Sequence, residues 1–204
     1  MTSPNLRING DAVAVNLTDD HPVWMPLRHT HGRVHNTAIT GPAYSGKTRM
    51  LAYLRLAAHD AGMDVRAIDP LDAAAGPAHD VLEAAAVDLD QRIAGGHRQP
   101  SIITVDNTAH LVDDFPSGRR LARLIELGPQ LGIGVYYTAE TVNGQTKGVH
   151  LGMSNVDSVI ALREAAFGFG FRTVDLAHWP AAWRSAATRE TTGFAPAAAV
   201  NQHA

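Results

Sequence analysis

The chain has 204 residues, of which 45% are hydrophobic and 18% are charged, and its formal net charge at pH 7 is -3. This length suits a single domain with one substantial core, and the small net charge argues against a surface coated for nucleic-acid binding, although a local basic patch is still compatible. Cysteine is absent, which excludes disulfides and thiolate metal sites, and the sequence shows neither a signal peptide nor a run of about 18 apolar residues, so we expect a soluble cytoplasmic protein.

The first 30 residues predict a small antiparallel extension ahead of the main domain. Short alternation in the stretch AVAVNL, residues 12–17, is bounded by turn residues and predicts a hairpin or an edge strand. We therefore divide the chain into an N-terminal extension, residues 1–30, and a larger domain, residues 31–200.

From residue 34 onward, predicted strands alternate with predicted helices. The strands are short apolar runs, at residues 34–40, 64–69, 101–106, 133–138 and 157–163. The helices present apolar side chains at helical spacing, namely Leu51, Leu54 and Ala58 in the first, Leu82, Ala86, Leu89 and Ile93 in the second, and Leu121, Leu124 and Ile125 in the third, at about 118–130. This alternation predicts an α/β fold with a mostly parallel central sheet flanked by helices. The tail predicts a loop, a short helix and a closing hairpin at 187–200.

A glycine-rich stretch, GPAYSGKT, lies between the first of these strands and its helix. It consists of Gly41, Pro42, Ala43, Tyr44, Ser45, Gly46, Lys47 and Thr48 and matches the phosphate-binding pattern G-x-x-x-x-G-K-[ST]. In such a P-loop, backbone N–H groups face the phosphates at the positive end of a helix. Lys47 would reach the β- and γ-phosphates, and Thr48 would offer its hydroxyl to Mg²⁺. An ordinary glycine-rich turn is the alternative, but the strand and helix on either side favour ATP and Mg²⁺ binding.

Asp106 is the last residue of the predicted strand SIITVD. A P-loop enzyme needs a carboxylate at the end of a neighbouring strand to hold the water shell of Mg²⁺, which is the Walker B position. A helix cap is the alternative role for an aspartate at this place. The preceding P-loop favours the metal-site interpretation.

The order of segments resembles the motor domain of the FtsK/SpoIIIE-type ATPases, a RecA-like family that pumps double-stranded DNA and powers some conjugation and secretion systems. The resemblance covers about residues 34–173 and rests on ITGPAYSGKT, VRAIDP, IITVDNTAHLVDD, RRLARLIELGPQLGIGVYYTAE and the pair NVDSVIALR and FRTVDL. It implies a RecA-like P-loop fold in reduced form and ATP hydrolysis coupled to double-stranded DNA translocation or transfer. It also implies self-association into a hexameric ring. The family's membrane segments and winged-helix domain have no counterpart here, so anchoring would come from a membrane-anchored or accessory protein or be absent.

The chain departs from this family at two positions. Family members carry a catalytic glutamate after the Walker B aspartate, whereas this chain has Asn107, which can hydrogen-bond a water but cannot accept its proton. Glu140 replaces a glutamine that senses the γ-phosphate, and a negative charge beside a phosphate is unfavourable without Mg²⁺ or an arginine. Hydrolysis would therefore be slow or would depend on another carboxylate, such as Asp113, Asp114 or Glu140.

Arg172 matches an arginine that the family extends toward the nucleotide of a neighbouring subunit, where it stabilises charge on the transferred phosphoryl group. A solvated loop arginine is the alternative. The competing function is a nucleotide-gated binding or scaffold protein with little or no hydrolysis, which Asn107 favours. A small-molecule kinase shares the P-loop, but no arginine-rich lid segment follows the fourth strand.

Two further clusters carry weaker signals. Arg119, Arg120 and Arg123 could contact DNA phosphates, although such a cluster is more often a solvated helix face. Three histidines, His29, His31 and His35, suggest a metal site, but no carboxylate lies at a matching spacing, so we expect none.

Overall fold

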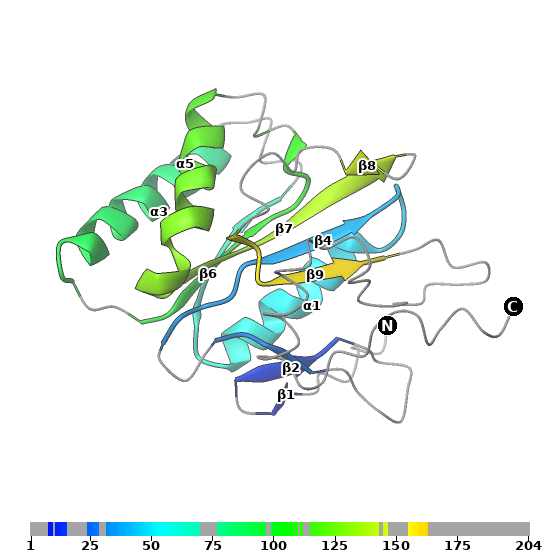
Figure 1. The fold of residues 1–204 in the computed structure, drawn as a ribbon, viewed down its shortest axis with the longest axis horizontal. Coiled ribbons are helices and arrows are strands. Elements are labelled where there is room, and N and C mark those ends of the chain that lie inside the picture. The colour runs from blue at the N-terminus through cyan, green and yellow to red at the C-terminus, as the bar shows by residue number, and fades with distance from the viewer. Residues whose placement is uncertain are drawn as a thin grey trace, which may run out of the picture.

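The computed structural model describes residues 8–9, 11–15, 24–28, 32–69, 77–96, 99–109, 111, 115–142, 145–146 and 155–162. These residues form a small N-terminal sheet and a larger sheet covered by helices (Figure 1). The predicted C-terminal hairpin lies outside the described residues.

The N-terminal sheet is antiparallel, with β2 between its two neighbours. Its strands are β1 (Ile8–Asn9), β2 (Ala12–Ala14) and β3 (Trp24–Pro26). The predicted N-terminal hairpin is thus confirmed, and a third strand extends it. Tyr53 in the first helix of the main domain donates a hydrogen bond to the carbonyl of Ala14 at 2.8 Å, which attaches the small sheet to the larger domain. The domain boundary at residue 30 stays a prediction.

The main sheet has the strand order β5-β6-β7-β4-β9, with all five strands parallel. These strands are β4 (Thr37–Gly41), β5 (Asp64–Ile68), β6 (Ser101–Val105), β7 (Ile133–Val142) and β9 (Ser158–Ala161). A short strand, β8 (Gln145–Thr146), pairs antiparallel with the end of β7. The mostly parallel sheet expected from the sequence is therefore confirmed.

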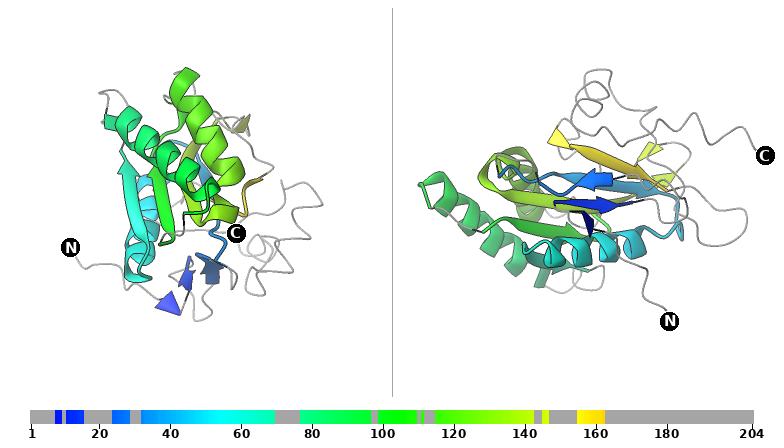
Figure 2. Two further views of the ribbon diagram at one scale, coloured as in Figure 1. Left: turned by 90° about the vertical axis from the view of Figure 1, so that its left-hand side faces the viewer. Right: turned by 90° about the horizontal axis from the view of Figure 1, so that it is seen from below.

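Helices cover both faces of the main sheet. They are α1 (Lys47–Asp60), α3 (Pro77–Ile93) and α5 (Phe115–Leu127), and a 3₁₀ turn, η1 (Pro129–Leu131), follows α5. The chain crosses from β4 to β5 in one direction and returns through β6 to β7 in the other. Right-handed crossovers that run in opposite directions across a sheet place their helices on opposite faces. Accordingly, α1 covers one face while α3 and α5 pack together on the other (Figures 1 and 2).

Most of the side chains predicted to face inward are buried, but Ala86 is only partly buried and Ile93, at the end of α3, is exposed. The confirmed residues are Leu51, Leu54, Ala58, Leu82, Leu89, Leu121, Leu124 and Ile125. Ile93 was predicted to be inward but is 51% exposed, whereas its neighbour Arg92 is 7% exposed. The prediction was wrong because it used only the spacing of apolar residues. That spacing does not reveal an arginine that is buried with its charge neutralised inside the fold.

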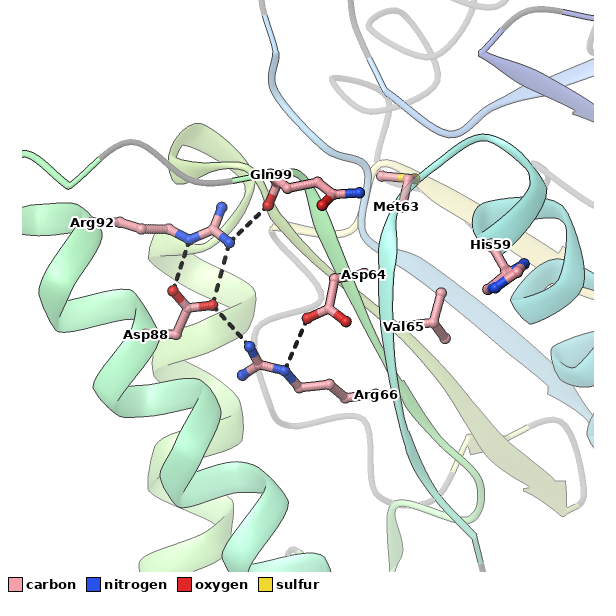
Figure 3. Close-up of a pocket in the computed structure, with 8 residues that line it drawn as sticks. All are labelled: His59, Met63, Asp64, Val65, Arg66, Asp88, Arg92 and Gln99. Carbon is pink, nitrogen blue, oxygen red and sulfur yellow. Dashed lines mark hydrogen bonds and ion pairs between the residues drawn. The ribbon is translucent and has the colours of Figure 1, made fainter.

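Arg92 can be buried because its guanidinium forms an ion pair and hydrogen bonds inside the fold. Its Nε lies 3.2 Å from Oδ1 of Asp88, one helical turn earlier, and it also donates to the carbonyls of Leu131 at 2.9 Å and Gln99 at 3.0 Å. Asp88 receives a second guanidinium from Arg66 of β5 at 3.2 Å (Figure 3). Buried charges are tolerated when they are paired and hydrogen-bonded in this way.

This ion-pair cluster lines a cavity of about 570 Å³ at the amino ends of β5 and β6, the edge of the sheet opposite the P-loop. The cavity is lined by His59, Met63, Asp64, Val65, Arg66, Asp88, Arg92 and Gln99 (Figure 3). Arg66 also pairs with Asp64 at 3.2 Å. Because these charged groups neutralise one another, we assign the cluster to holding α3 against the sheet.

Asn36, just before β4, connects four segments of the main domain from a fully buried position. Its Nδ2 donates to the carbonyls of Ile125 at 2.7 Å and Asn155 at 2.9 Å, and its Oδ1 accepts from the N–H of Val135 at 2.8 Å. Its own N–H donates to Oδ2 of Asp157 at 2.8 Å. The side chain thereby fixes the start of β4 relative to α5, β7 and the segment that leads into β9.

We predict that Asn36→Ala destabilises the protein by about 3 kcal/mol, because each buried polar group left without a partner costs roughly 1–3 kcal/mol. Urea unfolding measures this loss. Gln130→Ala, at an exposed position of η1, is the control and should leave the free energy of unfolding nearly unchanged. Equal midpoints for the two variants would contradict the role assigned to Asn36.

Candidate nucleotide-binding site

The stretch GPAYSGKT joins the carboxyl end of β4 to the first turn of α1, as the sequence predicts. A β-carbon at Gly41 would lie 2.5 Å from the carbonyl oxygen of Leu162 and 2.6 Å from Oγ of Ser45, so no larger residue fits there. Gly46 caps the helix with a φ of 94°, a conformation that glycine adopts without strain. Glycine is therefore needed at these two positions of the motif for different steric reasons.

The loop and the start of α1 form a polar cradle. The helix has 14 residues, and its first turn carries no acidic side chain to compete for its N–H groups. Thr48 lies exposed in this first turn. Oγ of Ser45 is buried and makes no hydrogen bond within the described part of the chain. Free N–H groups and the positive end of a helix dipole favour an anionic ligand here.

Lys47 lies folded over the loop. Its ammonium donates to the carbonyls of Gly41 at 3.0 Å and Pro42 at 2.6 Å. Burial lowers the pKa of the Lys47 ammonium, while the negative charges of Glu140 and Asp106 act on it in the opposite direction. The Lys47 ammonium is thus bound to the loop carbonyls and is influenced by the charges of two carboxylates.

Asp106 follows β6 and is 4% exposed. Its N–H donates to the carbonyl of Ile68 at 2.9 Å, and its Oδ1 accepts a hydrogen bond from the hydroxyl of Thr138 at 2.5 Å. Its Oδ2 is buried and has no hydrogen-bond partner among the residues that the structure describes. A buried carboxylate oxygen with spare acceptor capacity suits a water molecule held by Mg²⁺.

Asn107 has a φ of 61°, in the left-handed region that asparagine tolerates better than most residues. Its N–H donates to Oγ1 of Thr138 at 2.7 Å. The Thr138 hydroxyl therefore binds both consecutive residues, accepting from Asn107 and donating to Asp106. The hydroxyl of Thr108 donates in turn to the Thr138 carbonyl at 3.1 Å. Sequence reasoning missed Thr138, although a threonine within the apolar run IGVYYT is a visible signal.

Glu140 lies on β7 in register with Gly41 on β4, beside the first residue of the P-loop. Its side chain is exposed. The structure thus brings Lys47, Asp106, Asn107 and Glu140 to the same edge of the sheet. Arg172, Asp113 and Asp114 lie outside the described residues.

The basic cluster on α5 is engaged within the fold. Arg120 pairs with Glu83 at 3.1 Å, and Arg123 pairs with Asp90 at 2.6 Å, so both tie α5 to α3. These pairs favour the helix-face interpretation over contact with DNA phosphates.

Two other sequence expectations concern metals and membranes. In the part of the chain that the structure describes, no three His, Cys, Asp or Glu side chains gather as a metal site; His29 and His31 lie outside it. None of the described helices combines the length and apolar character that a bilayer span requires.

Solved structures with a similar fold include three of the ATPases EssC and EccC. EssC (ATPases 2 and 3) from Geobacillus thermodenitrificans has a TM-score of 0.56 and 17% identity, over 80% of this chain and 40% of that protein. The cytoplasmic domain of the type VII secretion ATPase EccC from Thermomonospora curvata has a TM-score of 0.58 and 15% identity, over 77% and 24%. EccC (ATPases 2 and 3) from the same organism, in complex with a signal sequence peptide, has a TM-score of 0.53 and 16% identity, over 86% and 37%.

This chain therefore spans well under half the length of these proteins. Neither a protein-family model nor a curated protein matches its sequence. At such low identity the structural likeness concerns the fold alone. The chain has the α/β fold of RecA-like P-loop NTPases.

We predict that Thr138→Val destabilises the protein by about 1–3 kcal/mol, because it leaves Oδ1 of Asp106 and the N–H of Asn107 without their shared partner. Urea unfolding measures the change. The matched control is Thr40→Val on β4, another threonine that is buried in the sheet. A loss no larger than that of the control would show that Thr138 does not hold this turn.

Proposed function

We propose that this chain is an ATP- and Mg²⁺-binding ATPase domain of the FtsK/SpoIIIE type, in which hydrolysis drives the translocation or transfer of double-stranded DNA. The observation that carries the proposal is the meeting of the P-loop, the Lys47 ammonium and the unpaired Oδ2 of Asp106 at one edge of the sheet. The resemblance of the sequence segments to this family and the shared fold support it.

The residues of the cradle fit a nucleotide. The N–H groups of residues 41–48 would hold the phosphates, and Lys47 would exchange its contacts with the loop carbonyls for the β- and γ-phosphates. Thr48 would bind Mg²⁺ directly, and Asp106 would hold its water shell. Mg²⁺ supplies charge neutralisation between the β- and γ-phosphate oxygens when it is bound.

Hydrolysis needs a group that accepts a proton from the attacking water. Asn107 can orient that water but cannot take the proton, and Asp106 is committed to Thr138 and to the metal waters. Glu140 is exposed beside Gly41, and its charge acts on Lys47. We assign the γ-phosphate side of the site to Asn107 and Glu140, with Glu140 as the carboxylate that replaces the missing glutamate.

The remaining parts of the proposal concern the assembly. Arg172 would act on the nucleotide of an adjacent subunit in a hexameric ring, which would make turnover depend on self-association. A membrane-anchored or accessory protein is the further partner that a short motor domain would need. Secretion ATPases share the fold, so a protein cargo is the competing outcome for the substrate that is moved.

A second function is favoured by one residue. Asn107 stands where a catalytic carboxylate is needed, so the chain could bind ATP as an assembly switch and hydrolyse little of it. The two functions share the same nucleotide site and differ in turnover.

We predict that the native chain hydrolyses ATP slowly and that double-stranded DNA accelerates turnover. Steady-state phosphate release with and without DNA measures both quantities. Lys47→Ala should abolish turnover because it removes the charge that holds the β- and γ-phosphates. Asn107→Glu should raise the rate because it supplies a proton acceptor beside the metal site, an effect worth roughly 10²–10⁴-fold in general base catalysis.

Glu140→Gln is the variant that separates the two functions, since it keeps the shape and removes the charge. If Glu140 is the replacement base, Glu140→Gln abolishes turnover while ATP binding persists or strengthens. Tight ATP binding by the native chain with no turnover at any DNA concentration would establish the switch and reject the motor.

A further inference from the structure

Tyr44 stands in the middle of the P-loop in a strained conformation. Its φ is 61°, in the left-handed region, where a β-carbon crowds the following carbonyl and a bulky side chain is an outlier. The N–H of Ser45 donates to the carbonyl of Pro42 at 3.3 Å, so Tyr44 occupies the second inner position of a tight turn. Glycine would adopt this conformation at lower cost.

Nothing in the described part of the fold offsets this cost. The Tyr44 side chain is 97% exposed and buries almost no surface. The other exposed large apolar side chains that the structure describes are aliphatic and lie on helices, namely Leu56, Val87, Ile93 and Leu127. Tyr44 is thus the one exposed aromatic ring among them, and a strained residue that gains nothing from folding indicates a role in function.

The position of Tyr44 limits what it can contact. The loop N–H groups and Lys47 surround the place for phosphates, so the ribose and the base of a nucleotide must leave the cradle at its rim. Tyr44 belongs to this loop, three residues before Lys47 and two after Pro42, whose carbonyl binds the Lys47 ammonium, and it is exposed to solvent. A base needs an apolar face to stack on, and a tyrosine ring supplies one.

We propose that the Tyr44 ring stacks on the base of the bound nucleotide and that it is the residue by which this site distinguishes a nucleotide from a bare polyphosphate. The inference rests on the proposed ATP site. It adds a contact that the phosphate-binding pattern does not specify, since Tyr44 occupies one of the four unconstrained positions of that pattern. Stacking is tolerant of base identity, so the contact favours nucleotides in general.

The test compares ATP with inorganic tripolyphosphate, which carries a similar chain of phosphates and no nucleoside. Calorimetric titration in the presence of Mg²⁺ would give the affinity of each ligand for the native chain, Tyr44→Phe and Tyr44→Ala. Tyr44→Ala keeps the β-carbon and therefore the loop conformation. It should weaken ATP binding about tenfold while tripolyphosphate binding stays unchanged. Tyr44→Phe keeps the ring and should bind ATP like the native chain.

Two control variants separate the ring from the backbone strain. Tyr44→Gly relieves the strained conformation, so it should raise the midpoint of thermal unfolding while weakening ATP binding. Leu56→Ala removes an exposed apolar side chain from α1 and should change neither ligand's affinity.

Three results would overturn the inference. Equal weakening of ATP and tripolyphosphate by Tyr44→Ala would show that Tyr44 acts through the loop backbone. Unchanged ATP affinity of Tyr44→Ala would show that the ring does not touch the base. If this variant also fails to self-associate, the ring belongs to a contact between subunits. If the native chain binds ATP and tripolyphosphate no better than Lys47→Ala does, the proposed function itself is rejected. That result is distinct from the first two.

Discussion

The parallel pairing of β7 with both β4 and β6 is the constraint on which the site depends. Through β4, it sets Glu140 beside Gly41 at the start of the P-loop. Through β6, it brings the Thr138 hydroxyl to Asp106 and Asn107. The two halves of the site come from segments that are far apart in the sequence, and only this central strand holds them in register. A shift of β7 by one residue would turn Thr138 to the opposite face and leave Asp106 without its donor.

This edge of the sheet carries one ammonium and two carboxylates before any ligand binds. Lys47 lies among the carbonyls of Gly41 and Pro42 and the carboxylates of Asp106 and Glu140, so its positive charge is already compensated. A polyphosphate that enters must displace the carbonyls and meets two like charges. A cation that accompanies the phosphates removes this repulsion, and the exposed Glu140 is further screened by solvent. Binding at this site should therefore be strongly coupled to the divalent ion.

Local patterns in the sequence predicted those parts of the structure that depend on residues close together in the chain. The strand, loop and helix around Lys47 follow from periodicity and glycine spacing, and so does Asp106 at the end of a buried strand. The interactions of Asn36 and Arg92 could not be predicted in this way. Asn36 meets Ile125 and Asn155, which are 89 and 119 positions away, and Arg92 meets Leu131, 39 positions away. Each polar residue looks unfavourable inside an apolar pattern until its distant partners are known, so the register of α3 was misassigned at Ile93. Thr138 was missed for the same reason, because its partners Asp106 and Asn107 are 32 and 31 positions away.

β7 has 10 residues and continues past the last residues that β4 and β6 pair with it, where its end joins β8 (Figure 1). Thr138 and Glu140 are therefore carried on the same continuous strand as this projecting end. Extended backbone in a hydrogen-bonded sheet is stiff along its length, so a pull on the projection is transmitted to the two site residues without a flexible joint between them.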